Sequence, residues 1–168
     1  MPSVFGYVGL GSNLGHREEN LRAGLIAMAR GGVAPTAVSS VWETEPVGGA
    51  GPLWFLNMVA RVTTVLTPEA VLAVLLAVER ERGRERSQAN APRTLDLDLL
   101  TLGDLRRDAP DLRLPHPRLG SRRFVLAPLA ELAPEFEPRL AALDDPHRVI
   151  SRGKLALPET LLVYSPAL

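Results

Sequence analysis

The chain has 168 residues, close to the size of one compact domain, and its 46% hydrophobic content is enough for a single core. Its 19 basic and 19 acidic side chains cancel, so no overall field attracts nucleic acid or an anionic membrane. The absence of cysteine excludes a disulfide framework and a thiolate site. We expect one domain over residues 1–168, a cytoplasmic location, no nucleic-acid or membrane partner and no obligate protein partner.

Targeting and membrane signals are weak throughout the sequence. The first ten residues lack the basic start of a signal peptide. The longest apolar run, residues 70–78, is far below the ~20 residues that a membrane span requires.

The first half of the chain alternates strand and helix patterns. Residues 4–10 are β-branched and aromatic and run into a Gly-Ser-Asn turn, which predicts a first strand. Leucines at helical spacing predict a helix over residues 18–30, ended by two glycines. A second strand is expected near residues 38–42, and the Pro- and Gly-rich residues 44–52 predict an irregular loop.

The second half contains the clearest helix and two alternating strands. Residues 55–65 alternate with period two, which places Phe55 and Asn57 on one face and Leu56 and Met58 on the other. Thr67, as a cap before a first-turn proline, predicts a helix that stops at Gly83.

The remaining segments are a polar loop, a strand and a short helix. Residues 84–92 are charged without apolar period and predict a loop, and residues 95–103 predict a strand. Residues 124–134 predict a short helix with Pro128 in its first turn. Residues 138–168 form a tail in which few structural signals occur.

Two carboxylates in the strand at residues 95–103 are the first candidate site. Leu95, Leu97 and Leu99 point to one side, so Asp96 and Asp98 point to the other, about 7 Å apart. Like charges this close favour a cation between them, and carboxylate oxygens suit Mg²⁺. A solvated strand face would show the same alternation, so the pair alone leaves both interpretations open.

Arginines close to the pair favour a magnesium–nucleotide site. Arg93 directly precedes the strand, and the loop before it carries Arg84 and Arg86. Guanidinium groups bind phosphate oxygens in a planar, bidentate way. The alternative is a surface salt-bridge patch, which contributes only ~0 to 1 kcal/mol per pair and does not require such a density of charge.

A series of motifs resembles the 6-hydroxymethyl-7,8-dihydropterin pyrophosphokinase family. These motifs are GLGSNLG (9–15), SSVWETEPVGG (39–49), FLN (55–57), VERERGR (78–84), PRTLDLDLL (92–100) and LPHPRLGSRRFVLAPLAELAP (114–134). The resemblance covers roughly residues 4–137. It implies an α+β fold with a ferredoxin-like core, in which helices lie on both faces of an antiparallel sheet.

The resemblance also implies a magnesium-dependent transfer of pyrophosphate from ATP to the pterin hydroxymethyl group in folate biosynthesis, giving AMP. It implies Asp96 and Asp98 as Mg²⁺ ligands, and Arg84 and Arg93 as further catalytic residues. ATP would bind to Glu79, Arg84, Arg93, His116 and Arg122. His116 alone would more often be a structural or surface histidine, and Arg118 has no expected role.

For the pterin, the resemblance implies stacking between Phe55 and Phe124, amide recognition by Asn57, and contacts from Thr44 and Val47. A flat heterocycle gains from aromatic faces, and a fixed amide can match its edge. Ordinary core packing is the alternative for both phenylalanines, although Phe55 shares the face of Asn57.

The loop from Arg84 to Ala91 is expected to close over the nucleotide, since a site that excludes water from ATP usually needs a lid. Some relatives carry a tryptophan in this loop where Asn90 falls, so a stacking role at Asn90 is in doubt. No general base can be named.

There are three alternatives to this function, and no residue supports the third. A magnesium-dependent kinase with another acceptor would give ADP. A small module for single-stranded nucleic acid would use the arginines and aromatics, but the neutral charge and acidic pair argue against it. An inactive relative would keep only the fold.

Overall fold

The computed structural model describes residues 2–47, 51–83 and 92–162. Its main sheet has six strands in the order β5-β1-β4-β3-β8, with β2 also paired to β4. The strands are β1 (Val4–Ser12), β2 (Ala34–Val38), β3 (Trp42–Thr44), β4 (Phe55–Thr64), β5 (Asp96–Leu102) and β8 (Val149–Ser151). The pairs formed by these strands are antiparallel.

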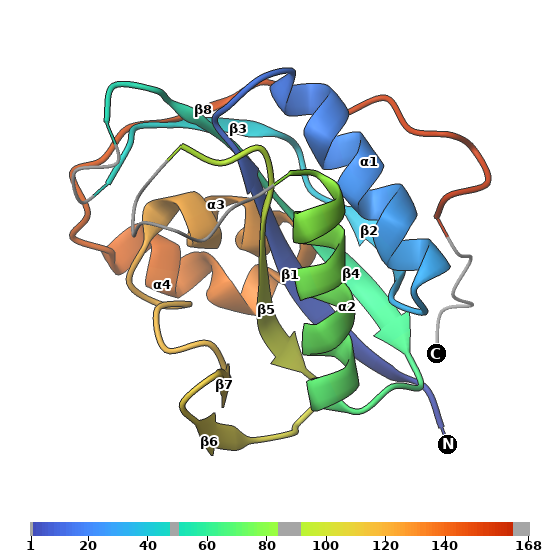
Figure 1. Cartoon of the computed structure of the whole chain (residues 1–168). Helices are drawn as coiled ribbons and strands as arrows, with labels where there is room; N and C mark the ends of the chain where they lie inside the picture. Colours follow the sequence, from blue (N-terminus) through green and yellow to red (C-terminus); the bar gives the residue numbers. More distant parts are fainter. Residues whose placement is uncertain (1, 48–50, 84–91, 163–168) are drawn as a thin grey trace.

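Helices cover both faces of this sheet (Figure 1). They are α1 (Arg17–Arg30), α2 (Pro68–Glu81), α3 (Arg123–Leu132) and α4 (Glu137–Ala142), with a 3-10 turn at Pro134–Phe136. A separate hairpin consists of β6 (Arg107–Ala109) and β7 (Leu112–Leu114). The α+β architecture with an antiparallel sheet between helices is confirmed.

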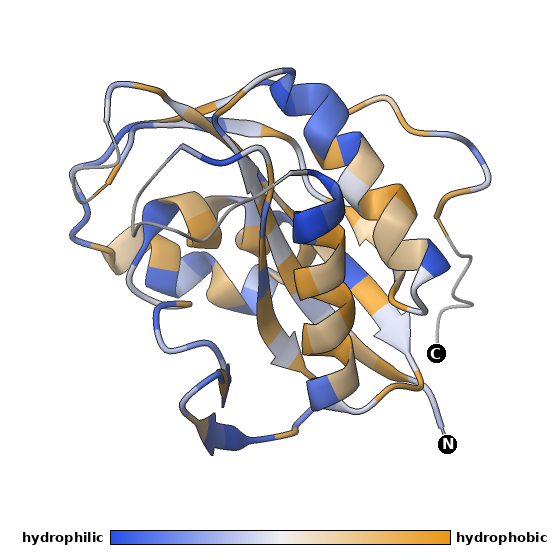
Figure 2. Ribbon diagram, viewed as in Figure 1, coloured by the Kyte–Doolittle hydropathy of each residue, from blue (hydrophilic) through white to orange (hydrophobic). Residues whose placement is uncertain are grey.

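The two faces of the sheet belong to two apolar clusters. Val8, Leu56 and Met58 pack with α1 and α2, whereas Val59 and Leu100 pack with α3. Figure 2 shows hydrophobic residues along the central strands and the middle of α2, with hydrophilic residues at the N-terminal end of α1. Burial of apolar area on both faces therefore fixes the positions of the helices.

Local signals placed several elements correctly. Thr67 Oγ1 accepts a hydrogen bond from Ala70 N, and Pro68 begins α2, as a capped first turn requires. Helix α1 ends before Gly31 and Gly32, and Gly32 has a φ of +93°. Residues 45–47 and 51–54 form no helix or strand, in agreement with the loop expected there.

Two predictions were wrong. A strand was expected near residues 38–42, but this segment contains the break between β2 and β3. These two strands pair with successive parts of β4. Ser39 occupies the break, where its N donates to Val59 O and its Oγ accepts from Val59 N. The bond from Val59 N to the Ser39 side chain thus takes the place of a backbone hydrogen bond between the strands at this position.

The second error concerns Pro128, which lies inside α3 and not in its first turn. Proline removes one helical hydrogen bond, here the one to the carbonyl of Phe124. The helix continues because Leu126 and Leu129, both fully buried, pack against the sheet.

None of the helices in the described part of the chain has the length and apolar character that crossing a membrane requires.

Candidate active site

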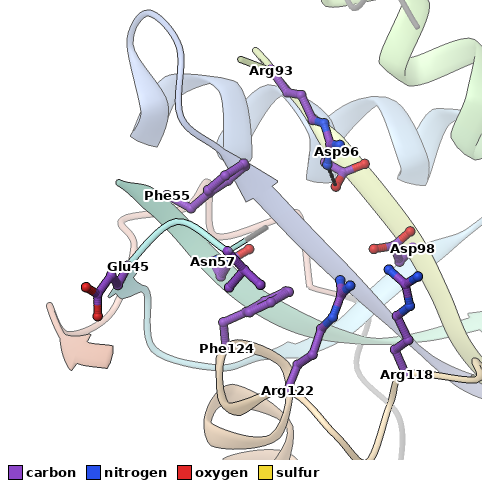
Figure 3. Close-up of a pocket in the computed structure, with 10 residues that line it drawn as sticks. Glu45, Phe55, Asn57, Arg93, Asp96, Asp98, Arg118, Arg122 and Phe124 are labelled. Atoms are coloured by element: carbon purple, nitrogen blue, oxygen red, sulfur yellow. Dashed lines mark hydrogen bonds and ion pairs between the residues drawn. The ribbon is translucent and has the colours of Figure 1, made fainter. Parts of the chain in front are cut away.

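A cavity of about 220 Å³ opens on the face of the sheet that carries α3 (Figure 3). It brings together three carboxylates, three guanidinium groups and two aromatic rings. The lining residues are Glu45, Val47, Phe55, Asn57, Arg93, Asp96, Asp98, Arg118, Arg122 and Phe124. Most of the residues expected from sequence therefore meet in one hollow.

The carboxylate pair lies at the edge strand β5. Leu97 and Leu99 are buried on the opposite face, and Asp96 and Asp98 both line the cavity. Their partners across the β1–β5 ladder are Gly11 and Gly9, which place no side chain between the carboxylates and the cavity. The predicted shared orientation of the two acids is confirmed.

The donor set of this pair fits Mg²⁺. Its two carboxylates offer hard oxygen ligands. Within residues 2–47, 51–83 and 92–162, no cluster of three or more Asp, Glu, His or Cys side chains has an arrangement that could hold a metal ion. Mg²⁺ commonly takes one or two carboxylates and fills its shell with water and phosphate oxygens. A site with two protein ligands therefore suits a metal that arrives with a nucleotide.

Arginines surround the carboxylates. Arg93 Nη1 donates to Asp96 Oδ2 at 2.9 Å, and Figure 3 shows the side chains of Arg118 and Arg122 pointing toward Asp98. Burial and the nearby charge of Arg118 lower the pKa of Arg122, although Asp98 opposes the shift. Cations crowded in this way are stabilised by an additional anion such as a phosphate.

The backbone of Arg93 is fixed by Asn13. Asn13 N donates to Arg93 O at 3.0 Å, and Arg93 N donates to Asn13 Oδ1 at 2.6 Å. The Gly-Ser-Asn turn after β1 therefore holds the residue that pairs with Asp96.

The aromatic part of the cavity contains Phe55, at the start of β4, and Phe124, in the first turn of α3. Figure 3 shows these rings on either side of Asn57. The guanidinium carbon of Arg122 lies 5.4 Å from the centroid of the Phe124 ring, within cation–π range.

Asn57 is oriented by Thr44. Its Nδ2 donates to Thr44 Oγ1 at 2.7 Å, and Thr44 is 2% exposed. Thr44 does not line the cavity, so its side chain acts on Asn57. A direct contact between Thr44 and a pterin stays a prediction.

A larger cleft of about 710 Å³ adjoins the cavity. Its apolar side comes from Leu72 and Leu76 of α2 and from Leu112 of β7. It shares five lining residues with the smaller cavity: Arg93, Asp96, Asp98, Arg118 and Arg122. The charged groups thus lie where two hollows meet.

His116 lines the larger cleft only. Its Nδ1 accepts a hydrogen bond from Arg118 N at 3.1 Å. Burial, Arg122 and Arg118 lower its pKa, while Asp96 acts in the opposite direction. The neutral ring therefore carries its proton on Nε2, which can donate to a phosphate.

Among the described residues, the predicted ATP ligand Glu79 lies outside both hollows. Glu79 is buried in α2, where its Oε1 accepts from Leu97 N at 3.4 Å, and it lines neither hollow. Arg84 and Asn90, with the expected lid at 84–91, lie outside the described residues.

The cavity also contains residues without an expected role. Glu45 directly follows the predicted Thr44, and Arg118 belongs to the HPR segment that supplied His116. Their neighbours in sequence could have indicated both. The apolar residues of the larger cleft show only the ordinary pattern of buried helices and strands.

Comparison with known proteins identifies the family of the chain. Residues 7–134 match the model of the 7,8-dihydro-6-hydroxymethylpterin-pyrophosphokinase (HPPK) family. The 2-amino-4-hydroxy-6-hydroxymethyldihydropteridine pyrophosphokinase of Bacillus subtilis is 42% identical over 132 residues, which cover 78% of this chain and 79% of the relative. The enzyme of that name from Pseudomonas aeruginosa is 44% identical over 131 residues, or 77% and 81% of the two chains.

Longer relatives match over part of their length. The mitochondrial folate synthesis bifunctional protein of Arabidopsis thaliana is 44% identical over 125 residues, which cover 74% of this chain and 23% of the relative. A crystal structure of an HPPK-DHPS in complex with substrates superposes with a TM-score of 0.66 at 12% identity, covering 84% of this chain and 43% of that one. This structural likeness supports the fold. From the match over residues 7–134 and the bacterial relatives, the chain belongs to the HPPK family.

Proposed function

We propose that this protein transfers the pyrophosphoryl group of ATP to the hydroxymethyl group of 6-hydroxymethyl-7,8-dihydropterin, giving AMP and the pterin diphosphate. One observation carries the proposal: the carboxylates and arginines lie at the junction of two hollows. A transfer reaction needs a site for each substrate and charged groups between them.

The smaller cavity suits the pterin. Phe55 and Phe124 offer faces for a flat ring, and the Asn57 amide, held by Thr44, offers a fixed hydrogen-bonding group. A ring in this cavity would direct its hydroxymethyl group toward the carboxylates and arginines.

The larger cleft suits ATP. Its apolar side chains would contact the adenine, and Arg93, Arg118, Arg122 and His116 would bind the phosphates. Asp96 and Asp98 would hold Mg²⁺, which supplies charge neutralisation on the phosphate oxygens. Arg84 is a further proposed nucleotide contact, whereas Glu79, which is buried beneath the cleft, would act through its bond to Leu97 N.

The chemistry is a displacement at the β-phosphorus. The substrate hydroxyl oxygen forms a bond to the β-phosphorus, the bond to the bridging α–β oxygen breaks, AMP leaves, and the hydroxyl proton passes to solvent. The arginines stabilise the charge that builds up on the transferring group. The protein thus contributes positioning and electrostatics, with no covalent intermediate.

Product analysis tests the proposal. The protein is incubated with ATP, MgCl₂ and 6-hydroxymethyl-7,8-dihydropterin, and nucleotides are separated by anion-exchange chromatography. We expect AMP and pterin diphosphate in equal amounts, and none when MgCl₂ is replaced by EDTA. ADP as the product would instead indicate a kinase that transfers one phosphoryl group.

A further inference from the structure

Residues 143–154, the C-terminal strap, contact two elements that line the smaller cavity: the start of α3 and the loop between β3 and β4. The strap begins after α4 and contains β8, which adds to the sheet beside β3 (Figure 1). The family match ends at residue 134, before the strap begins. Its contacts therefore lie beyond the segment that the family model matches.

The first wall is held by Asp145. Its Oδ2 accepts a hydrogen bond from Arg123 N at 2.8 Å, at the first residue of α3. Its Oδ1 accepts from His147 N at 3.0 Å and lies 2.6 Å from His147 Nδ1. Arg123 Nη2 donates in return to the carbonyl oxygens of Leu143 and Asp145, at 3.1 and 3.2 Å.

Asp145 acts as a cap for α3 from a distant part of the chain. The residue before the helix, Arg122, makes no side-chain capping bond. A carboxylate at a helix N-terminus satisfies a free N–H and interacts favourably with the helix dipole. The Asp145 side chain is only 9% exposed, so solvent screens this contact little. The next residue of the helix after Arg123 is Phe124, whose ring lines the cavity.

The second wall is held by Arg148. Glu45 and Trp54 are the first and last residues of the loop between β3 and β4, and Arg148 contacts both. Arg148 N donates to Glu45 Oε2 at 2.9 Å, and Glu45 N donates to Arg148 O at 2.9 Å. The Arg148 guanidinium carbon lies 5.0 Å from the Trp54 ring centroid. Arg148 thus contacts both ends of this loop, next to Thr44 and next to Phe55.

We propose that the C-terminal strap positions both walls of the pterin cavity, with Asp145 acting on Phe124 and Arg148 acting on the loop that ends at Phe55. Without these contacts the first turn of α3 and the loop would spend time in other conformations. Apparent affinity falls with the fraction of molecules in the competent conformation. The inference rests on the proposed function, because pterin binding is its readout.

Asp145→Ala tests the proposal at α3. We expect the KM for the pterin to rise roughly 3- to 10-fold, the usual effect of losing a helix cap, with the KM for ATP unchanged. Asp145→Asn keeps an oxygen that can accept from Arg123 N, so it restores most of the affinity. A purely structural role would instead lower the melting temperature without separating the two KM values.

Arg152→Ala is the matched control. Arg152 lies on the same strap, and its Nη2 donates to Glu43 Oε1 at 2.9 Å. Glu43 belongs to β3, so this bond reaches neither the loop between β3 and β4 nor α3. We expect both KM values of Arg152→Ala to match those of the wild type. Equal pterin KM values in Asp145→Ala, Arg152→Ala and the wild type would overturn the proposal.

Hydrogen exchange tests the role of the strap without relying on the proposed function, because it needs no substrate. The amides of Val125 and Leu126 donate to the carbonyl of Arg122 in the first turn of α3. Without any substrate, we expect them to exchange about tenfold faster in Asp145→Ala than in Arg152→Ala. Unchanged exchange overturns the strap proposal even if the wild type makes AMP, whereas failure of the wild type to make AMP overturns only the proposed function. Should Asp145→Ala not fold, the pterin KM of Arg148→Ala, which loses the contact with the Trp54 ring, is compared with that of Arg152→Ala, and equal values overturn the proposal.

Discussion

Gly11 of β1 lies directly opposite Asn57 of β4, and a β-carbon on Gly11 would come within 2.6 Å of Asn57 Oδ1. The same β-carbon would lie 3.5 Å from Cδ1 of Phe55. The first distance is too short for any side chain to be tolerated without movement. Only glycine at position 11 leaves the amide where it is.

Gly11→Ala should therefore displace Asn57 and weaken pterin binding. We expect the KM for the pterin to rise roughly tenfold, because overpacking shifts the amide, with little change in the KM for ATP. Steady-state kinetics with each substrate varied in turn measures both values. Gly9→Ala is the control on the same face of β1, since its β-carbon meets nothing closer than 3.8 Å. A normal pterin KM in Gly11→Ala would show that the amide position does not matter.

Thr44→Val tests the contribution of the Thr44 hydroxyl separately from that of the side-chain volume. The substitution removes the acceptor for Asn57 Nδ2 and leaves the buried shape almost unchanged. We expect a roughly 3- to 10-fold higher Kd for the pterin, measured by fluorescence titration, because the amide loses its orienting partner. Thr44→Ser, which keeps the hydroxyl, should bind like the wild type, and equal weakening in both variants would refute this role.

Asp96→Ala and Asp98→Ala should each reduce turnover by roughly a thousandfold or more while the protein stays folded. The reason is loss of the ligands that hold Mg²⁺ at the transferring phosphate, an effect of several kcal/mol. AMP formation and circular dichroism measure activity and fold. Asp104→Ala, an exposed carboxylate in the turn after β5, is the control. Near-normal turnover in either variant would remove that residue from the metal site.

The acid stability of the protein should depend on Asp145. Burial alone would raise its pKa, but hydrogen bonds from Arg123 N and from the N–H and ring of His147 hold the pKa below its ordinary value. A carboxylate with a lowered folded pKa stabilises the protein fully above the unfolded value of about 3.9, and this stability is lost as pH falls through the folded pKa. The melting temperature of Asp145→Asn should thus lie below that of the wild type at neutral pH, and the difference should shrink as the pH falls through the lowered pKa of Asp145 in the folded protein. A difference in melting temperature that stays constant with pH would show that ionisation of Asp145 contributes nothing to the stability of the fold.

The parts of the fold that were predictable are those in which local pattern and tertiary environment agree. Alternation in residues 55–64 placed Phe55 and Asn57 opposite the buried Leu56 and Met58. The same argument placed Asp96 and Asp98 on one face. The period-two pattern is visible at these positions because one face packs against α1 and α2, whereas the other face lines the cavity.

The errors occurred where distant residues decide the local structure. Ser39 breaks the expected second strand because its side chain bonds to Val59, twenty residues further along the chain. Helix α3 begins at Arg123, where Asp145 caps it, so Pro128 is its sixth residue and lies beyond the first turn. Strand β8 is short and largely exposed, so it carries no apolar alternation.

The site shows the same division between local and distant effects. Asn57 was identifiable from its strand, but the orienting role of Thr44 depends on the β3–β4 register. Similarly, the larger cleft is lined jointly by residues of α2, β5 and β7 and of the segment around His116, which no local pattern in the sequence indicates.

Binding of Mn²⁺ in place of Mg²⁺ tests most directly whether Asp96 and Asp98 share a divalent ion with the nucleotide. Electron paramagnetic resonance counts free Mn²⁺ in the presence of a non-hydrolysable ATP analogue, for the wild type and for the Asp96→Asn/Asp98→Asn double variant. We expect the wild-type complex to bind Mn²⁺ at least tenfold more tightly than the analogue alone, and the double variant to show no gain over the analogue. Equal Mn²⁺ affinity in the two proteins would contradict the assignment of the carboxylate pair.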